Sequence, residues 1–196
     1  MPHRVRDTIP TMLPAPATIS MMAIIIKRTL PVHHKTTAPV EYGVTPPEIM
    51  ASMPGIEFVR AIFSGKLPAP PIMQTVEPFD STAEPGVVVM HSIPGFRHYN
   101  PIGSVHGGYA ATLLDSAMGL AVHSMLPAGT GYTTLEFKIS FIRGMTKDTG
   151  PVRSEGRVLN VGRRAATAEA RITDSKGRLL AHATTTCLVF EIPKGT

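Results

Sequence analysis

The hydrophobic positions of the chain follow a helical period in one segment and a strand period directly after it. Between residues 107 and 125, apolar and small side chains recur at spacings of three and four, which predicts one long helix. Its apolar face is formed by Ala110, Leu113, Leu114, Ala117, Leu120 and Ala121. Pro127 and Gly129 follow and are expected to stop the helix. The period then changes to two, which predicts a half-buried strand whose buried face carries Leu135, Phe137, Ile139 and Phe141.

Three more strand-like segments follow in succession, at residues 152–161, 165–173 and 179–190. Turn-forming residues separate the last two, at Asp174-Ser175-Lys176-Gly177. A valine-rich run at 86–91 predicts another strand before the helix. One helix followed by four successive strands indicates an α+β domain in which an antiparallel sheet wraps around one long central helix.

The first 44 residues differ from the rest of the chain, because they contain six prolines and show no sustained period. We expect residues 1–44 to be a proline-rich basic tail without a stable fold, or sequence upstream of the true start. A leader peptide is less favoured, since no small-residue cleavage pattern follows Met21 to Ile26. One domain is expected over residues 45–196. It opens with a helix that is capped by Thr45, interrupted near Pro54-Gly55 and ended by the prolines at 68–71.

Charge and cysteine content narrow the class of protein. The formal net charge of +5 divides into +3 for residues 1–44 and +2 for the remainder. A nearly neutral body with a few placed cations fits a small phosphorylated ligand better than a nucleic acid. The single cysteine, Cys187, excludes an intrachain disulfide and is expected to be a buried core residue of a cytoplasmic protein. No apolar run is long enough for a membrane span.

Two polar features of the predicted helix are candidates for chemistry. The first is the segment from Asn100 to Gly108, in which His106 precedes two glycines at the start of the helix. The unpaired N–H groups of a helix start can hold a carbonyl oxygen as it becomes negatively charged. The second is Asp115, a carboxylate inside an otherwise apolar helix, where desolvation costs free energy unless the group is paired or used.

These two features cannot meet within one chain. Nine residues separate His106 from Asp115, which corresponds to about 14 Å along a helix at 1.5 Å per residue. If both act on the same carbonyl group, Asp115 must come from a second copy of the chain, and a two-fold dimer then contains two identical composite sites. Nucleophile elbows, phosphate loops, dinucleotide fingerprints and metal-ligand spacings are all missing from the sequence, so neither a metal nor an organic cofactor is expected.

The segment from His98 to Asp115, the segment Gly131-Tyr-Thr-Thr-Leu-Glu-Phe-Lys-Ile-Ser-Phe and the closing segment from Gly177 resemble one known family. They are similar to the hot-dog-fold acyl-CoA thioesterases of the phenylacetate-pathway (PaaI) type, which are relatives of the 4-hydroxybenzoyl-CoA thioesterases. The resemblance covers residues 48 to 190. It implies hydrolysis of acyl-CoA by a homodimer or homotetramer, with coenzyme A present only as part of the substrate.

The resemblance also implies roles for individual residues. The Gly107 N–H polarises the thioester carbonyl, with Asn100 holding that carbonyl or the attacking water. Asp115 of the partner chain is the general base or the nucleophile, and His106 positions the loop or assists the departing thiolate. A hydroxyl on the next strand orients the water, and strand register favours Thr134 over Thr133.

Three arginines are candidates for the coenzyme A phosphates by charge and location, namely Arg143, Arg163 and Arg164. The family often has a proline after the first of these, where this sequence has Gly144. Two other interpretations remain open: a hot-dog dehydratase or hydratase, and a non-catalytic acyl-CoA-binding protein. The spacing of His106 and Asp115 on one helix suits the hydrolase pattern better than the dehydratase pattern. The sequence leaves open the acyl group, the choice between dimer and tetramer, and the role of residues 1–44.

Overall fold

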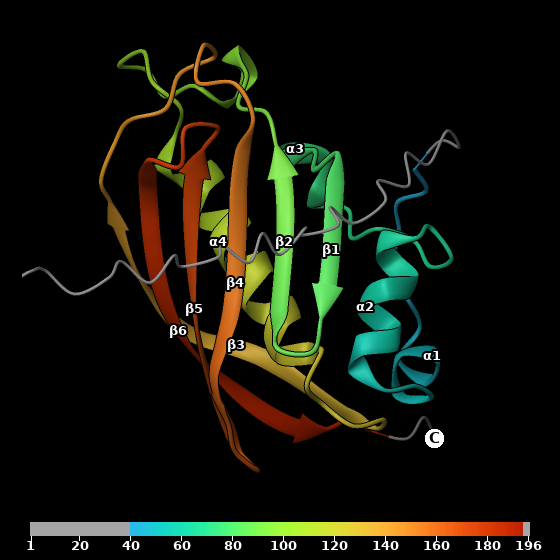
Figure 1. Cartoon of the computed structure of the whole chain (residues 1–196). Coiled ribbons are helices and arrows are strands. Elements are labelled where there is room, and N and C mark those ends of the chain that lie inside the picture. The colour runs from blue at the N-terminus through green and yellow to red at the C-terminus, as the bar shows by residue number, and fades with distance from the viewer. Residues whose placement is uncertain (1–39, 194–196) are drawn as a thin grey trace, which may run out of the picture. The chain divides into compact units, whose positions relative to one another are not determined.

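A six-stranded antiparallel sheet curves around one long helix in the computed structural model, which describes residues 40–193 (Figure 1). The strand order across the sheet is β1-β2-β4-β5-β6-β3. The strands are β1 (Asp80–Glu84), β2 (Val87–Ser92), β3 (Thr130–Phe141), β4 (Val152–Val161), β5 (Ala165–Asp174) and β6 (Leu179–Glu191). The helices are α1 (Pro47–Ala51), α2 (Gly55–Phe63), α3 (Met73–Val76), the 3-10 turn η1 (Phe96–His98) and the central α4 (Gly107–His123). The predicted α+β class and the central helix are confirmed.

Two local predictions were wrong and one strand was missed. The N-cap of α1 is Pro46 and no side chain caps it, so Thr45 does not cap this helix. The helix that follows Pro54 ends at Phe63, ahead of the prolines that were expected to stop it. Strand β1 was missed because its sequence, Asp-Ser-Thr-Ala-Glu, has no run of alternating apolar residues. It is a short edge strand that, among the described residues, pairs only with β2.

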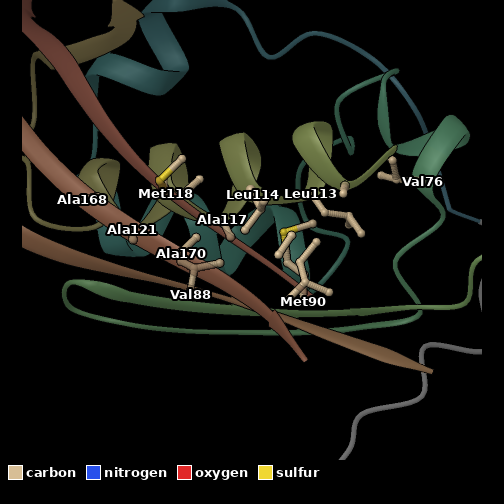
Figure 2. Packing of buried hydrophobic residues seen from close by; sticks show 14 of the residues in the cluster. Val76, Val88, Met90, Leu113, Leu114, Ala117, Met118, Ala121, Ala168 and Ala170 are labelled. Carbon is tan, nitrogen blue, oxygen red and sulfur yellow. The ribbon is translucent and has the colours of Figure 1, made fainter. Parts of the chain in front are cut away.

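The apolar face of α4 lies on the concave side of the sheet, as Figure 2 shows for Leu113, Leu114 and Ala117 against strand residues such as Val88 and Ala170. These five side chains are at most 1% exposed. Helix and sheet approach closely where β4 crosses the middle of the helix. A Cβ atom on Gly156 would lie 2.2 Å from the carbonyl oxygen of Ala117, so only glycine fits there. This contact fixes the distance between the helix and the strands that carry the core.

Strand β3 contains an irregularity that the sequence pattern did not reveal. The β3–β6 register shifts between Thr134 and Glu136, which leaves Leu135 as an extra residue. The bulge moves the inward face from even positions to odd ones: Tyr132 packs on the core before it, and Phe137 and Ile139 after it. The prediction that Leu135 and Phe141 are buried was therefore wrong, since they are 60% and 58% exposed.

Two residues of the expected tail, Tyr42 and Gly43, contact the domain. Tyr42 forms a parallel bridge with Ala69, and the N–H of Gly43 donates to the Ala69 carbonyl at 3.0 Å. The segment that ends the expected tail therefore contacts the body of the domain, and the rest of that tail, residues 1–39, lies outside the described residues. In residues 40–193, no helix is both long enough and apolar enough to cross a bilayer. Cys187 is fully buried, as expected.

His123, at the end of α4, predicts a pH dependence of stability. Its ring stacks on Phe58 at a centroid distance of 5.0 Å, and burial lowers its pKa from 6.5 to about 4. The unfolded chain therefore binds a proton in a range where the folded chain does not. This part of the stability is fully present above pH 6.5 and is lost as the pH falls towards 4, by about 3 kcal/mol in total.

We expect the His123→Phe variant, which keeps the stacking, to lose less stability than the wild type between pH 6.5 and 4. Urea unfolding at a series of pH values measures the difference. Parallel curves for the two proteins would show that His123 does not titrate in this way.

Candidate active site

The start of α4 presents a backbone N–H group without an acceptor. Gly107 is the first residue of the helix and His106 is its N-cap. Nδ1 of His106 accepts a hydrogen bond from the Gly108 N–H at 2.8 Å, whereas no residue within 40–193 accepts from the Gly107 N–H. The positive end of the helix dipole adds to the potential at this group. The Gly107 N–H is thus able to bind a carbonyl oxygen that gains negative charge.

The end of β3 covers the same glycine. A Cβ atom on Gly107 would lie 2.9 Å from Cζ of Phe141, so the missing side chain lets the aromatic ring approach the backbone. Because Phe141 is 58% exposed, its ring forms an apolar wall that borders both the Gly107 amide and solvent. Sequence reasoning had placed Phe141 in the core and missed this position.

Asn100 organises the loop that leads into the helix. Its Oδ1 accepts from the N–H groups of Ile102 and Ser104, both at 3.1 Å, and its Nδ2 donates to Oγ of Ser104 at 3.0 Å. An amide nitrogen carries two protons, so one donor of Asn100 is left for a ligand. The contact of Asn100 with substrate or water stays a prediction, and it depends on this remaining N–H.

Asp115 lies two turns into α4 and faces β3. Its Oδ1 accepts a hydrogen bond from Oγ1 of Thr134 at 3.0 Å. Both residues are half-buried, whereas Thr133 is exposed. The structure therefore brings Asp115 together with Thr134 and leaves Thr133 away from it. This pair accounts for the carboxylate in an apolar helix, since the hydroxyl offsets part of the cost of desolvation.

Neutral groups surround this carboxylate. Cys187 lies opposite Thr134 in the β3–β6 ladder, and burial raises the pKa of its thiol despite hydrogen bonding with Thr134 and Thr185. Burial, with smaller contributions from Cys187 and Asp115, also raises the pKa of Tyr132. Neither group ionises at neutral pH, so neither adds a charge beside the carboxylate. Sequence reasoning missed Tyr132, although the period of two places it on the same face as Thr134.

The three arginines predicted to bind phosphates lie in two separate places. Arg143 lines a cavity of about 370 Å³ together with Lys176 and Arg178, beside the β5–β6 turn. Arg163 and Arg164 line a second cavity, of about 420 Å³, at the β4–β5 turn. The ten residues of β5 separate the two turns, a span of roughly 30 Å at about 3.3 Å per residue. One chain does not bring all three arginines around one ligand.

The structure also keeps His106 and Asp115 apart. Both lie on α4 or directly before it, so the continuous helix holds them about 14 Å apart along its axis. Nothing in the fold of one chain brings the Gly107 amide and the carboxylate to one reacting carbon atom. In the described part of the chain, no group of three or more His, Cys, Asp or Glu side chains could hold a metal ion.

Sequence comparison identifies relatives of this chain. A family model described as the thioesterase superfamily matches residues 102–181. A candidate esterase of Halobacterium salinarum is 38% identical over 72 residues, which cover 36% of this chain and 46% of that protein. The chain thus spans less than half the length of this curated relative.

Solved structures give longer matches. A candidate thioesterase of Ralstonia eutropha, related to phenylacetic acid degradation, is 25% identical with a TM-score of 0.60 over 67% of this chain and 98% of that chain. A conserved protein of Pseudomonas aeruginosa is 30% identical with a TM-score of 0.56 over 61% and 94%. A hypothetical thioesterase of Streptococcus pneumoniae, solved with coenzyme A, is 27% identical with a TM-score of 0.52 over 58% and 88%. With nearly the whole Pseudomonas chain covered and the family model spanning all of α4 and β3, this chain belongs to the thioesterase superfamily and has the hot-dog fold.

Proposed function

We propose that the protein hydrolyses acyl-CoA thioesters to a free acid and coenzyme A, with Asp115 as the base that activates water. The observation that carries this proposal is the hydrogen bond from Thr134 to Oδ1 of Asp115, which orients a half-buried carboxylate among neutral groups. The family membership and the coenzyme A bound to the Streptococcus relative support the substrate class. The protein's own groups supply the chemistry in this proposal, without a metal or an organic cofactor.

The reaction follows from these groups. Oδ2 of Asp115 takes a proton from a water molecule whose oxygen attacks the thioester carbonyl carbon. The electron pair of the carbonyl bond moves to its oxygen, and the N–H of Gly107 stabilises the negative charge there. The tetrahedral intermediate then collapses: the carbonyl bond re-forms, the carbon–sulfur bond breaks, and the leaving thiolate takes up the proton that Asp115 removed from water. The free Nδ2 donor of Asn100 holds the carbonyl oxygen or the water, and His106 keeps the helix start in place through its bond to Gly108.

Two chains are needed to assemble one such site, because α4 holds Gly107 and Asp115 too far apart. Strand β3 offers the means: it is an edge strand of 12 residues, and one of its edges pairs with no other strand of residues 40–193. Antiparallel pairing with β3 of a second copy, about a two-fold axis close to Lys138, brings Thr134 opposite the partner's Phe141. Since Thr134 contacts Asp115 and Phe141 covers Gly107, this pairing joins the carboxylate of one chain to the amide of the other.

Arg143 is the arginine best placed to bind a coenzyme A phosphate. It follows by two residues Phe141, whose ring covers the Gly107 amide of the same chain. Its cavity also contains Lys176 and Arg178, although Arg178 is engaged with Asp174 at 2.7 Å. Arg163 and Arg164 contribute to the same ligand only if they come from the other chain, because of their distance within one chain.

Replacing Asp115 tests the proposed base. We expect Asp115→Asn to fold and dimerise normally but to lose hydrolysis by at least about a hundredfold, since the amide cannot accept the proton. Thiol release from a panel of short-chain, long-chain and aromatic acyl-CoAs measures the loss. Glu57→Gln, on the exposed face of α2, removes the same charge elsewhere and serves as the control. Near-wild-type turnover by Asp115→Asn would refute the assignment.

A matched pair of threonine variants tests the orientation of the carboxylate. Thr134→Val keeps the shape of the side chain but removes the hydroxyl, and we expect kcat to fall by about tenfold, because the carboxylate loses the donor that orients it. Thr133→Val, one residue away and exposed, is expected to leave kcat unchanged. Equal effects of the two substitutions would contradict the assigned role of Thr134.

Mixed dimers test whether the site is shared. Gly107→Pro removes the N–H at the first helical position, where proline is tolerated, and Asp115→Asn removes the base. Each homodimer then contains two damaged sites. In a shared-site mixed dimer both lesions fall in one site and the other stays intact, so co-expression should restore about a quarter of wild-type activity. Absence of recovery in well-folded, demonstrably mixed dimers would show that Asp115 serves the amide of its own chain.

A further inference from the structure

We propose that His98 is a positioning residue that sets the direction of the Gly107 N–H, an inference that rests on the proposed function. His98 is 7% exposed and lies in η1, nine residues before the helix start. It does not belong to the set of groups that would touch the substrate. Its effect on the reaction is exerted through the backbone that leads to Gly107.

The side chain of His98 ties two loops together. Nδ1 accepts a hydrogen bond from the Gly95 N–H at 2.9 Å, and Nε2 lies 2.9 Å from the carbonyl oxygen of Thr75 in α3. A carbonyl only accepts, so Nε2 carries the proton and Nδ1 does not. The neutral imidazole in this one tautomer satisfies both contacts, whereas an imidazolium would place two N–H groups against each other at Gly95.

The surroundings of His98 keep it neutral. Burial lowers its pKa, the hydrogen bond to Thr75 acts in the opposite direction, and the charge of Arg97 lowers it further. The Nε–H of Arg97 also points at Nε2 of His98 from 3.2 Å, but a protonated Nε2 cannot accept from it, and the Arg97 guanidinium is paired with Glu77. The remaining titratable group against the ring is the phenol of Tyr109, whose pKa burial raises. At neutral pH the His98 ring is therefore uncharged and keeps its hydrogen bonds to Gly95 and Thr75.

The backbone of His98 connects its anchored side chain to the segment that carries the Gly107 N–H. Its carbonyl oxygen accepts the N–H of His106 at 2.7 Å, one peptide unit before the Gly107 amide. Tyr99, which follows His98, and Val105, which precedes His106, form an antiparallel bridge. The peptide that carries the Gly107 N–H consequently takes its orientation from the segment that His98 anchors.

Tyr109 holds the other side of the ring. Its ring stacks on His98 at a centroid distance of 4.4 Å, and its hydroxyl lies 2.5 Å from Oγ of Ser92, which in turn donates to the Val76 carbonyl. Tyr109 is two residues after Gly107, in the first turn of α4. The main-chain carbonyl of His98 thus contacts His106, just before Gly107, and its ring contacts Tyr109, two residues after Gly107.

Kinetics of three variants test this role. We expect His98→Leu, which fills the space but forms no hydrogen bonds, to lower kcat by about tenfold with little change in KM, because the amide that stabilises the transition state is misdirected. His98→Gln, which keeps a donor for Thr75, is expected to recover most of kcat. Tyr109→Phe loses only the bond to Ser92 and should lower kcat by a few-fold; it replaces His98→Leu if that variant does not fold.

A double-mutant cycle separates positioning from a general effect on folding. If His98 acts through the Gly107 N–H, then adding His98→Leu to Gly107→Pro should cause no further loss of kcat, because the N–H is already gone. In the Gly107→Ala background, which keeps the N–H, adding His98→Leu should lower kcat by the full tenfold. A full loss in both backgrounds would overturn the proposal, as would an unchanged kcat in His98→Leu with a lowered melting temperature.

A readout without substrate distinguishes failure of this inference from failure of the proposed function. In ¹⁵N-labelled protein, the Gly107 amide resonance should shift in His98→Leu and stay close to its wild-type position in His98→Gln. An unmoved resonance in a folded His98→Leu would refute the positioning role. If the resonance moves but neither the wild type nor the variants release thiol from any acyl-CoA, the positioning inference stands and the proposed activity is wrong.

Discussion

The contact between α4 and the inner face of β3 is the interaction on which the site depends. Helix and strand run in opposite directions, so that Gly107 meets Phe141, Asp115 meets Thr134, and Gly119 meets Tyr132. The contact at Gly119 requires glycine on the helix, because a Cβ atom there would lie 2.3 Å from the hydroxyl oxygen of Tyr132, whereas a Cβ atom on Gly107 would displace only the exposed ring of Phe141. Close packing thus determines both where the free amide lies and which hydroxyl reaches the carboxylate.

The bulge at Leu135 makes this arrangement compatible with a well-packed core. Upstream of it, the inward positions carry Tyr132, which packs against Gly119, and Thr134, which donates to Asp115; downstream, they carry apolar side chains. A regular strand would send one of these sets outwards, because a shift of one residue reverses the two faces. The extra residue therefore lets one strand serve both the site and the core, and it leaves Leu135 on the surface near the unpaired edge.

The two halves of the proposed site are held by different kinds of interaction. Asp115 is oriented by one side-chain hydrogen bond across the packed interface between α4 and β3. The Gly107 amide sits at the end of a loop whose shape depends on the Asn100 hydrogen bonds and on the His98 anchor. A helix of this length cannot bring the two halves together, and for this reason the proposed reaction requires two chains.

The sequence alone determined the fold class, the central helix, the strand series and the candidate residues on α4, because their periodicity and spacing are local properties of the chain. It also showed that His106 and Asp115 lie too far apart on one helix to share a site. Tertiary structure decided what depends on partners distant in sequence: the short polar strand β1, the bulge that exposes Leu135, the separation of Arg143 from Arg163 and Arg164, and the pairing of Asp115 with Thr134. The role of His98 belongs to this second group, since its contacts with Thr75, Tyr109 and the His106 backbone exist only once the loops have folded onto the start of α4.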